Sequence, residues 1–545
     1  MRREALALAL GATAATAGCG PGDDATLVGA PALSALIRPD TPGNNLQFNF
    51  APGDVVESFG STGGSFLVHF TRQGSNAVPD LDVDASGIPD FVEEVAAVYD
   101  EVLTIYQDDL GFRPPRGDEA IADNGGDGRF DVYLVDFGIS ADGHYSNDAC
   151  DPGNPEICAG YMVQENDFVG YGYPSTLIAN RILGSHEFFH AIQAAYDTGQ
   201  GSILTEGTAV WATETFDPSL NDFEKFIDGY LDYADRSLDV PLPGPVDVFS
   251  YGSAIFFQFL EERYGDGTVR ALWERCENGA NGKADPLWFE ELDATLTAEA
   301  DASFDEAFVE FATWNLFTGS LADPSRSYAN GAGYPRVPIE DVEAPFSDDE
   351  LRVFHASTQY YGVAPNGRAA MSAALIPKEG DPESMVGLSL LLAVERGPGY
   401  DPVVTAQDLG AGTETVDTSG AERLVVVVVN HLIEGSSRQP GLCIGTVDEI
   451  AACRIALIGD GSGGSGGAGA GGAGGGDGGN GGDAPAEPPP DEDTAGCGCR
   501  IVSGAPSGAT SLACLALLGL AFRRRKRGSL AADTGPSRRF RCSTY

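Results

Sequence analysis

Two histidines and a glutamate form the pattern HExxH at positions 186 to 190, as His186, Glu187 and His190. Residues four apart share one face of an α-helix, so both imidazoles can reach one cation while Glu187 stays free to hold a water molecule. With six histidines in 545 residues, the pattern is expected by chance in roughly a few per thousand such chains. The alternative interpretation is that both histidines belong to an ordinary core helix. Each imidazole would then need a buried polar partner. The motif predicts a hydrolytic zinc site with Glu187 as general base.

The residues around the motif predict the helix that must carry it. Pro174 and Ser175 form a typical helix entry with a capping serine, and apolar residues recur at helical spacing as far as Ala195. Catalytic zinc usually takes three protein ligands, so one more is needed. In the metzincin pattern a glycine and a histidine would stand where this sequence has Gln193 and Tyr196, which excludes that class. The acidic candidates that follow are Asp197, Glu206 and Glu214.

Glu206 opens a second apolar stretch, Glu206–Ala212, which is typical of the first turns of a helix with Thr205 as its cap. HExxH followed by this stretch resembles the gluzincin metallopeptidases of the broad thermolysin-like group. The resemblance implies that His186, His190 and Glu206 bind zinc, that Glu187 is the general base, and that the substrate is a protein or peptide. Fifteen residues separate His190 from Glu206, fewer than is usual in the aminopeptidase-type members, so Glu214 remains an alternative third ligand.

A tyrosine further along is the candidate for stabilising the oxyanion of the reaction. Ser250–Ser253 begins another amphipathic run, which continues to Leu260. Related peptidases often carry a tyrosine near such a helix, and Tyr251 occupies that place here. A tyrosine that only packs at a helix start is the alternative interpretation.

A calcium site is predicted upstream of the zinc motif. Oxygen-bearing side chains occupy positions 1, 3, 5, 9 and 12 of a loop that has a glycine at position 6, as in an EF-hand. These residues are Asp82, Asp84, Ser86, Asp90 and Glu93, with Gly87 as the glycine. A helix is expected after the loop, at 92–110, but Ser65–Phe70 before it alternates like a strand, so only half of an EF-hand is expected. An Asp-rich turn that caps a helix is the alternative.

A weaker loop of the same kind runs from Asp123 to Asp131 and leads into a predicted strand at 131–136. The two loops, this strand and HExxH together resemble a myxobacterial group of secreted metallopeptidases, over roughly residues 60 to 320. Calcium is therefore expected as a structural cofactor beside zinc.

Both ends of the chain carry signals of export and sorting. Residues 1–19 form a signal peptide, with a small-residue cleavage site at Ala15–Ala17, and Cys19 is a candidate for lipidation. Near the other end, a cysteine pair, the apolar stretch Ile501–Phe522 and the basic cluster Arg523–Arg527 resemble the Myxo-CTERM sorting signal. The resemblance implies a membrane span before processing, a sorting peptidase as partner, and display at the outer membrane or cell surface, or secretion. A plain membrane anchor is the alternative.

Charge and cysteine usage agree with export. The formal net charge is −49 and the pI is near 4.2. Because nucleic acid is also negatively charged, it is not expected to be a partner. The chain has ten cysteines, and two pairs are spaced so that each could close a short loop: Cys150 with Cys158, and Cys443 with Cys453. Cys276 would then have no disulfide partner in the globular part.

Composition divides the chain into segments. A signal peptide at 1–19 and an extension at 20–60 precede a metallopeptidase domain at 61–330. Short apolar runs at 345–458 predict a β-sandwich, and a Gly/Pro-rich linker at 459–495, the sorting signal at 496–527 and a tail at 528–545 follow. The fold class expected is α+β: a zincin-like domain with a small mixed sheet and active-site helices, then the sandwich. The function expected is an exported, surface-anchored zinc metallopeptidase; the alternative is an inactive, peptidase-like, calcium-dependent adhesion or scaffold protein.

Overall fold

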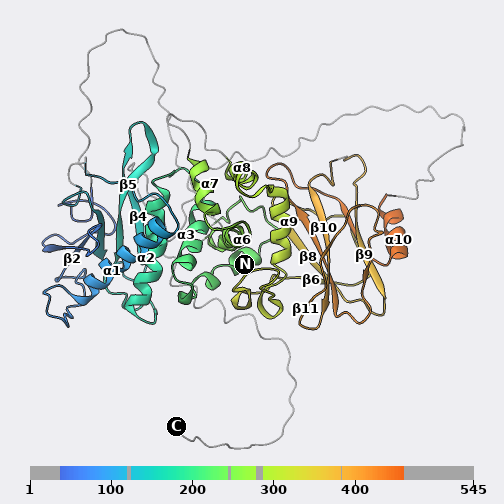
Figure 1. Ribbon diagram of the computed structural model, residues 1–545, viewed down its shortest axis with the longest axis horizontal. Helices are drawn as coiled ribbons and strands as arrows, with labels where there is room; N and C mark the ends of the chain where they lie inside the picture. Colours follow the sequence, from blue (N-terminus) through green and yellow to red (C-terminus); the bar gives the residue numbers. More distant parts are fainter. Residues whose placement is uncertain (1–36, 120–123, 244–246, 278–286, 382, 459–545) are drawn as a thin grey trace, which may run out of the picture. The chain divides into compact units, whose positions relative to one another are not determined.

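A five-stranded mixed sheet forms the first layer of the fold (Figure 1). The computed structural model describes residues 37–119, 124–243, 247–277, 287–381 and 383–458. Parallel strands β2, β3 and β5 lie in the middle of the sheet, and β1 and β4 pair antiparallel at its edges. In sheet order the strands are β1 (Val56–Gly60), β2 (Phe66–Thr71), β3 (Phe130–Val135), β5 (Asn154–Glu165) and β4 (Gly143–Asp151). The strands predicted at 65–70 and 131–136 are therefore confirmed.

Two helices, α1 (Asp90–Thr104) and α2 (Thr176–Gln193), pack on one face of this sheet and on each other. The helix expected at 92–110 is α1, which continues as a π-helical turn, η1 (Ile105–Asp109). The other face of the sheet is covered by residues that precede β1, because Phe48 and Phe50 pack with Tyr133 and Phe137 there. Burial on both faces explains why the central strands are apolar almost throughout.

Helices form the middle of the chain around an aromatic core. The first of them, α3 (Ser202–Phe216), packs against α2 and against α5 and α6. The others are α4 (Asp228–Leu231), α5 (Val248–Gly252), α6 (Ala254–Tyr264), α7 (Thr268–Cys276), α8 (Trp288–Ala300) and α9 (Phe304–Trp314). Short 3₁₀ turns lie at η2 (Pro218–Leu220), η3 (Phe223–Lys225), η4 (Gly319–Leu321) and η5 (Gly331–Gly333). The described chain is thus a mixed α+β structure with several sheets, as expected.

Two further sheets share a core in the region where a β-sandwich was predicted. The larger contains β11 (Gly399–Tyr400), β10 (Leu388–Arg396), β14 (Arg423–Asn430), β8 (Ser357–Val363) and β6 (Glu340–Val342), with β12 (Val404–Thr405) beside β10. The smaller contains β13 (Val416–Asp417), β9 (Ala370–Ile376), β15 (Gly441–Gly445) and β7 (Phe346–Asp348), and α10 (Val447–Ile458) follows it. Alternate residues of β14 face this shared core, and the others join the core formed by the helices. Both faces of β14 are buried, which accounts for its unbroken valine run.

Two disulfides form in the described part of the chain, Cys150–Cys158 and Cys443–Cys453, as the spacing suggested. Cys276 is a buried thiol in α7. Among the described helices, no segment is both long and apolar enough for a membrane span. The predicted signal peptide, linker and sorting segment, with Cys19 and Ile501–Phe522, lie outside the described residues.

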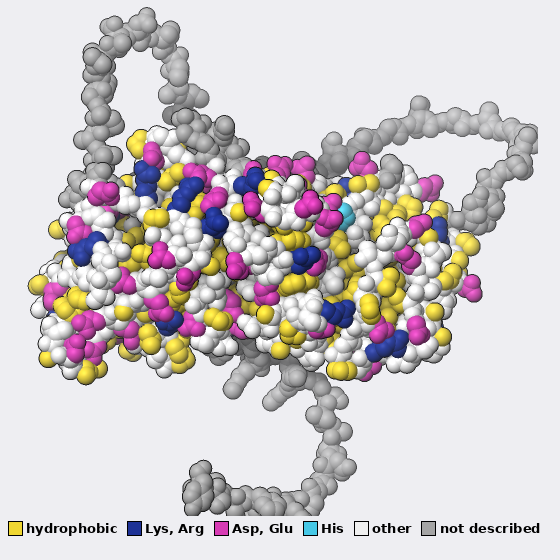
Figure 2. All heavy atoms as spheres, in the orientation of Figure 1, with side chains coloured by type: hydrophobic (Ala, Val, Ile, Leu, Met, Phe, Trp, Pro, Cys, Tyr) yellow, Lys and Arg dark blue, Asp and Glu magenta, His cyan; other side chains and the backbone are white. Residues whose placement is uncertain are grey.

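Charged side chains are dispersed over one face of the molecule. On the face drawn in Figure 2, acidic side chains are scattered among apolar and neutral ones, with fewer Lys and Arg between them. No single acidic patch on this face marks a site, so the candidate site has to be identified from buried groups.

Candidate metal centre

The two motif histidines lie on the last turns of α2, which begins as the sequence predicts. The Ser175 side chain accepts a hydrogen bond from the backbone N–H of Ile178 at 3.2 Å and so caps the helix. The end of α2 is buried between the sheet and α3, and His186 and His190 are 9% and 1% exposed. Their positions follow from the four-residue spacing and from this packing.

The third group comes from α3. This helix begins at Ser202 with Gly201 as its N-cap, so the prediction that Thr205 caps it is wrong. Thr205 is already inside the first turn, and its carbonyl accepts a hydrogen bond from Gln193. Gly207 permits the close approach of α3 to α6, because a Cβ there would lie 2.2 Å from Ser253 Oγ. Glu206, the residue before Gly207, therefore lies on a helix that packs against both α2 and α6.

His186, His190 and Glu206 converge on one point. Glu206 Oε2 lies 3.4 Å from His186 Nε2 and 3.6 Å from His190 Nε2. One ligand atom from each residue lies within 4.8 Å of the others, and all three side chains are buried. His190 Nε2 and Glu206 Oε2 have no hydrogen-bond partner, which is costly for buried polar atoms. Two imidazoles and a carboxylate are a typical donor set for zinc, so these residues fit such an ion.

The electrostatics of the group reflect the proximity of acid and base. Burial alone would raise the pKa of Glu206, but the His190 and His186 imidazoles lower it to about 2. Burial alone would lower the pKa of His190, but the Glu206 carboxylate raises it to about 9. The negative charge of Glu206 is therefore present throughout the neutral pH range, as a cation ligand requires.

Glu187 is held beside the edge strand of the first sheet. Its carboxylate is 1% exposed, and Oε2 accepts a hydrogen bond from the backbone N–H of Tyr145 in β4 at 3.1 Å. Within the described part of the chain, β4 pairs only with β5. The motif carboxylate therefore adjoins a strand with one unpaired edge. No sequence pattern predicts this contact between Glu187 and Tyr145.

Tyr251 lies on α5, and its ring is stacked on the ring of His186. The ring centroids are 5.8 Å apart with an interplanar angle of 9°, and Phe226 stacks on Tyr251 in turn. The structure therefore brings the predicted tyrosine to the metal group, although α5 is far from α2 in sequence.

Glu214, the alternative ligand, is not part of the group. It lies eight residues beyond Glu206 on α3, which is about 12 Å along a helix axis. Burial and the neighbouring carboxylate of Glu224 raise the pKa of Glu214 to about 7. Glu206, and not Glu214, is the carboxylate that meets both imidazoles.

The predicted calcium loop places three of its four candidate carboxylates together. Carboxylate oxygens of Asp82, Asp84 and Asp90 lie within 4.8 Å of one another, and Glu93 is not part of this group. Gly87 has φ of +89°, the left-handed conformation that the loop pattern requires at position 6. The Ser86 hydroxyl donates to the carbonyl of Ile88, and the Ser86 backbone N–H donates to Asp82 and Asp84.

The weaker second loop does not bring its carboxylates to one point in the described residues. Asp127 pairs with Arg129, and Asp131 is bonded to Arg38 and His69. The calcium site considered for this loop is therefore not formed by these two residues.

Asp131 belongs instead to a buried ionic cluster that sequence reasoning missed. Arg38, which is fully buried, contacts Asp118, Asp131 and Asp148, and His69 Nε2 lies 2.7 Å from Asp131 Oδ1. The cluster joins the segment before β1 to strands β2, β3 and β4. No local pattern could have predicted it, because its members are separated by as many as 110 residues.

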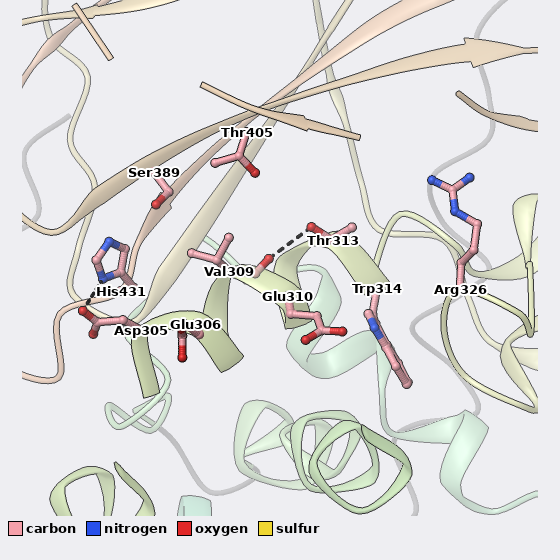
Figure 3. A pocket seen from close by; sticks show the side chains of 10 residues that line it. All are labelled: Asp305, Glu306, Val309, Glu310, Thr313, Trp314, Arg326, Ser389, Thr405 and His431. Carbon is pink, nitrogen blue, oxygen red and sulfur yellow. Dashed lines mark hydrogen bonds and ion pairs between the residues drawn. The ribbon is translucent and has the colours of Figure 1, made fainter. Parts of the chain in front are cut away.

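An open pocket with a volume of about 480 Å³ lies elsewhere, between α9 and the strands β10 and β12 (Figure 3). His431 Nδ1 and Asp305 Oδ2 are 3.2 Å apart at one end of it. Its lining contains none of the predicted catalytic or metal-binding residues: Asp305, Glu306, Val309, Glu310, Thr313, Trp314, Arg326, Ser389, Thr405 and His431.

Comparison with known proteins adds little to this geometry. No protein-family model and no curated protein matches the sequence. Among solved structures, the chain is similar to Legionella pneumophila aminopeptidase A in complex with aspartic acid, with a TM-score of 0.29 and 11% identity. The alignment covers 69% of this chain and 35% of that one, so it spans about a third of the aminopeptidase. A likeness of this size carries no argument about function.

Proposed function

We propose that the chain is a zinc metallopeptidase, with His186, His190 and Glu206 as zinc ligands and Glu187 as general base. The observation that carries the proposal is the buried His–His–Glu group, in which His190 Nε2 and Glu206 Oε2 have no hydrogen-bond partner. A cation bound by these atoms would remove their desolvation penalty. The motif carboxylate, Glu187, is next to one ligand in the chain and is not itself part of the group.

Zinc at this position would supply positive charge that polarises a peptide carbonyl and acidifies a water molecule. The residues of the chain supply the rest. Glu187, held by the Tyr145 backbone N–H, would take a proton from that water and pass it to the leaving amine. Tyr251, stacked on His186, would donate its hydroxyl hydrogen to the carbonyl oxygen as negative charge develops there.

The unpaired edge of β4 supports a peptide as the substrate. Backbone N–H and C=O groups along such an edge can bind an extended peptide as an additional strand. Because Tyr145 in β4 contacts Glu187, a peptide aligned on β4 would pass close to the motif carboxylate. The proposed substrate is thus an extended segment of a protein or peptide.

Calcium binding at the loop formed by Asp82, Asp84 and Asp90 is the second part of the proposal. Three carboxylates brought within 4.8 Å of one another repel, and an oxygen-binding divalent cation would relieve that repulsion. The loop leads directly into α1, which packs on α2, so calcium there would stabilise the helix pair that carries the motif.

Export and surface display complete the proposal on sequence grounds. The segments at 1–19 and 496–527 are proposed as the signal peptide and the sorting signal, flanking the metallopeptidase region at 61–330 and the sandwich at 345–458.

The test is a proteolysis assay on the purified full chain with an unstructured protein substrate. Wild-type activity that is lost with a chelator, restored by zinc and absent from Glu187→Ala supports the proposal. A wild-type protein that binds zinc but cleaves nothing over a broad substrate panel would instead support the inactive, scaffold-type alternative. Glu383→Ala, an exposed acid far from α2 in sequence, is the matched control and should retain full activity.

A further inference from the structure

His190 has a polar neighbour on its own helix that no zinc motif requires. His190 Nδ1 lies 2.8 Å from Oε1 of Gln193, three residues further along at the end of α2. Gln193 is 1% exposed, and its amide contacts α3 as well as His190. It is therefore placed between the two helices that carry the proposed ligands.

The direction of each hydrogen bond around Gln193 follows from neighbouring groups that can act only as a donor or only as an acceptor. The Trp273 indole N–H can only donate, and it lies 3.2 Å from Thr208 Oγ1. The Leu204 carbonyl can only accept, and Thr208 Oγ1 donates its single hydrogen to it at 2.6 Å. The Thr205 carbonyl, at 3.5 Å from Thr208 Oγ1, is also an acceptor, so the neighbour from which the Thr208 oxygen accepts is Gln193 Nε2 at 3.0 Å.

The same amide nitrogen lies 2.7 Å from the Thr205 carbonyl, another group that can only accept. Both hydrogens of the Gln193 amide are thus used on α3, and its oxygen must face His190. An amide oxygen cannot donate, so His190 Nδ1 has to carry the hydrogen. In the neutral imidazole, this leaves Nε2 as the nitrogen with a free lone pair.

The lone pair is the one that faces the metal group. His190 Nε2 is the buried, unpartnered atom 3.6 Å from Glu206 Oε2. Gln193, Thr208 and Trp273 are at most 1% exposed, so water does not compete for the bonds that connect them. A metal ligand whose other ring nitrogen is held in this way is more basic and better oriented.

We infer that Trp273, Thr208 and Gln193 form a hydrogen-bond relay that fixes the tautomer and orientation of His190, with Gln193 as the positioning residue. The relay connects α7, α3 and α2. The Thr205 carbonyl, which Gln193 contacts, belongs to the residue just before Glu206, so one amide connects His190 to the helical turn that carries Glu206. The inference rests on the proposed zinc site and assigns a role to a residue outside the HExxH motif.

The experiment compares wild type with Gln193→Met, which keeps side-chain length and removes both ends of the amide. Zinc dissociation constants are measured by competition with a chelator, and solvent exchange of imidazole N–H protons is measured by NMR in the zinc-loaded full chain. We expect Gln193→Met to weaken zinc binding by about 10- to 100-fold. We also expect the His190 Nδ1–H to exchange faster while the His186 proton keeps its rate.

Gln258→Met is the matched control, because this half-buried glutamine on α6 donates to Glu262 at 2.7 Å. It should leave both measurements unchanged. If Gln193→Met does not fold, Thr208→Val removes one of the contacts of the amide. It should weaken zinc binding by a few fold and also speed exchange at His190.

The outcomes separate the inference from the proposed function. A wild-type protein without zinc affinity would contradict the zinc site itself, and the relay with it. Zinc binding in the wild type that is the same in the folded Gln193→Met or Thr208→Val protein, with unchanged His190 exchange, would overturn the relay alone. A loss of thermal stability without a change at His190 would show a purely structural role and would also overturn it.

Discussion

Replacing Arg38 with methionine should strongly destabilise the protein, because the guanidinium is the shared partner of three buried carboxylates. Arg38 is fully buried and contacts Asp118, Asp131 and Asp148, of which Asp118 lies at 2.5 Å. Removing one partner of a buried ion pair typically costs about 3–5 kcal/mol, since the other charge is left uncompensated. With three carboxylates affected, we expect the upper part of this range at pH 8.

The cost should fall as the pH is lowered. Burial raises the pKa of Asp118 and of Asp148 even though Arg38 lowers each of them, and loss of Arg38 would raise both further. A carboxyl whose pKa is raised by folding destabilises the native state when it is ionised. This penalty decreases as the pH falls below the folded-state pKa and is gone only below the unfolded-state pKa. The difference between wild type and Arg38→Met should therefore be smaller at pH 5 than at pH 8.

Urea unfolding of the full chain, followed by tryptophan fluorescence, measures this difference. Arg263→Met is the matched control, because Arg263 pairs with Glu310 on the surface, where such pairs contribute at most about 1 kcal/mol. A free energy of unfolding for Arg38→Met within about 0.5 kcal/mol of wild type at pH 8 would refute the reasoning.

Three other predictions concern a pH-sensitive core residue, the oxyanion donor and the calcium loop. Burial raises the pKa of Glu165 from 4.5 to about 7, so its protonated form favours folding and stability falls as the pH rises between these values. Glu165→Gln should therefore gain up to about 3 kcal/mol relative to wild type between pH 5 and pH 8 in urea unfolding, and a pH-independent difference would contradict this. Tyr251→Phe should lower kcat by roughly 100-fold with little change in KM, whereas unchanged steady-state kinetics would assign the ring to packing alone. Calcium should raise the Tm of wild type but not of Asp84→Asn in a thermal melt; equal shifts in both would place any bound calcium elsewhere.

Local patterns predicted the elements whose residues are close in sequence. The HExxH helix, its Ser175 cap and the strand β3 follow from periodicity and capping, because the groups that interact are within one or two turns. The calcium loop shows the limit of this reasoning. Its carboxylates at 82 and 84 meet that of Asp90, the first residue of α1, but Glu93, about one turn further along this helix, does not join them.

Features that depend on packing between distant elements could not be predicted from periodicity. Glu206 was chosen over Glu214 by resemblance, and only the approach of α3 to α2 brings it to the imidazoles. Thr205 was misplaced as a helix cap because threonine favours that position locally, whereas packing extends α3 back to Ser202. The Arg38 cluster and the relay through Gln193 depend on contacts between strands or helices far apart in the chain.

Metal analysis of the purified full chain tests the central claim most directly. The account predicts equimolar zinc in the wild type and its loss in His186→Ala and in Glu206→Ala. It also predicts that zinc is retained in His355→Ala, because this histidine pairs with Asp239 and is not part of the metal group. A wild-type protein free of zinc after exposure to it, or a folded His186→Ala protein that keeps equimolar zinc, would contradict the account.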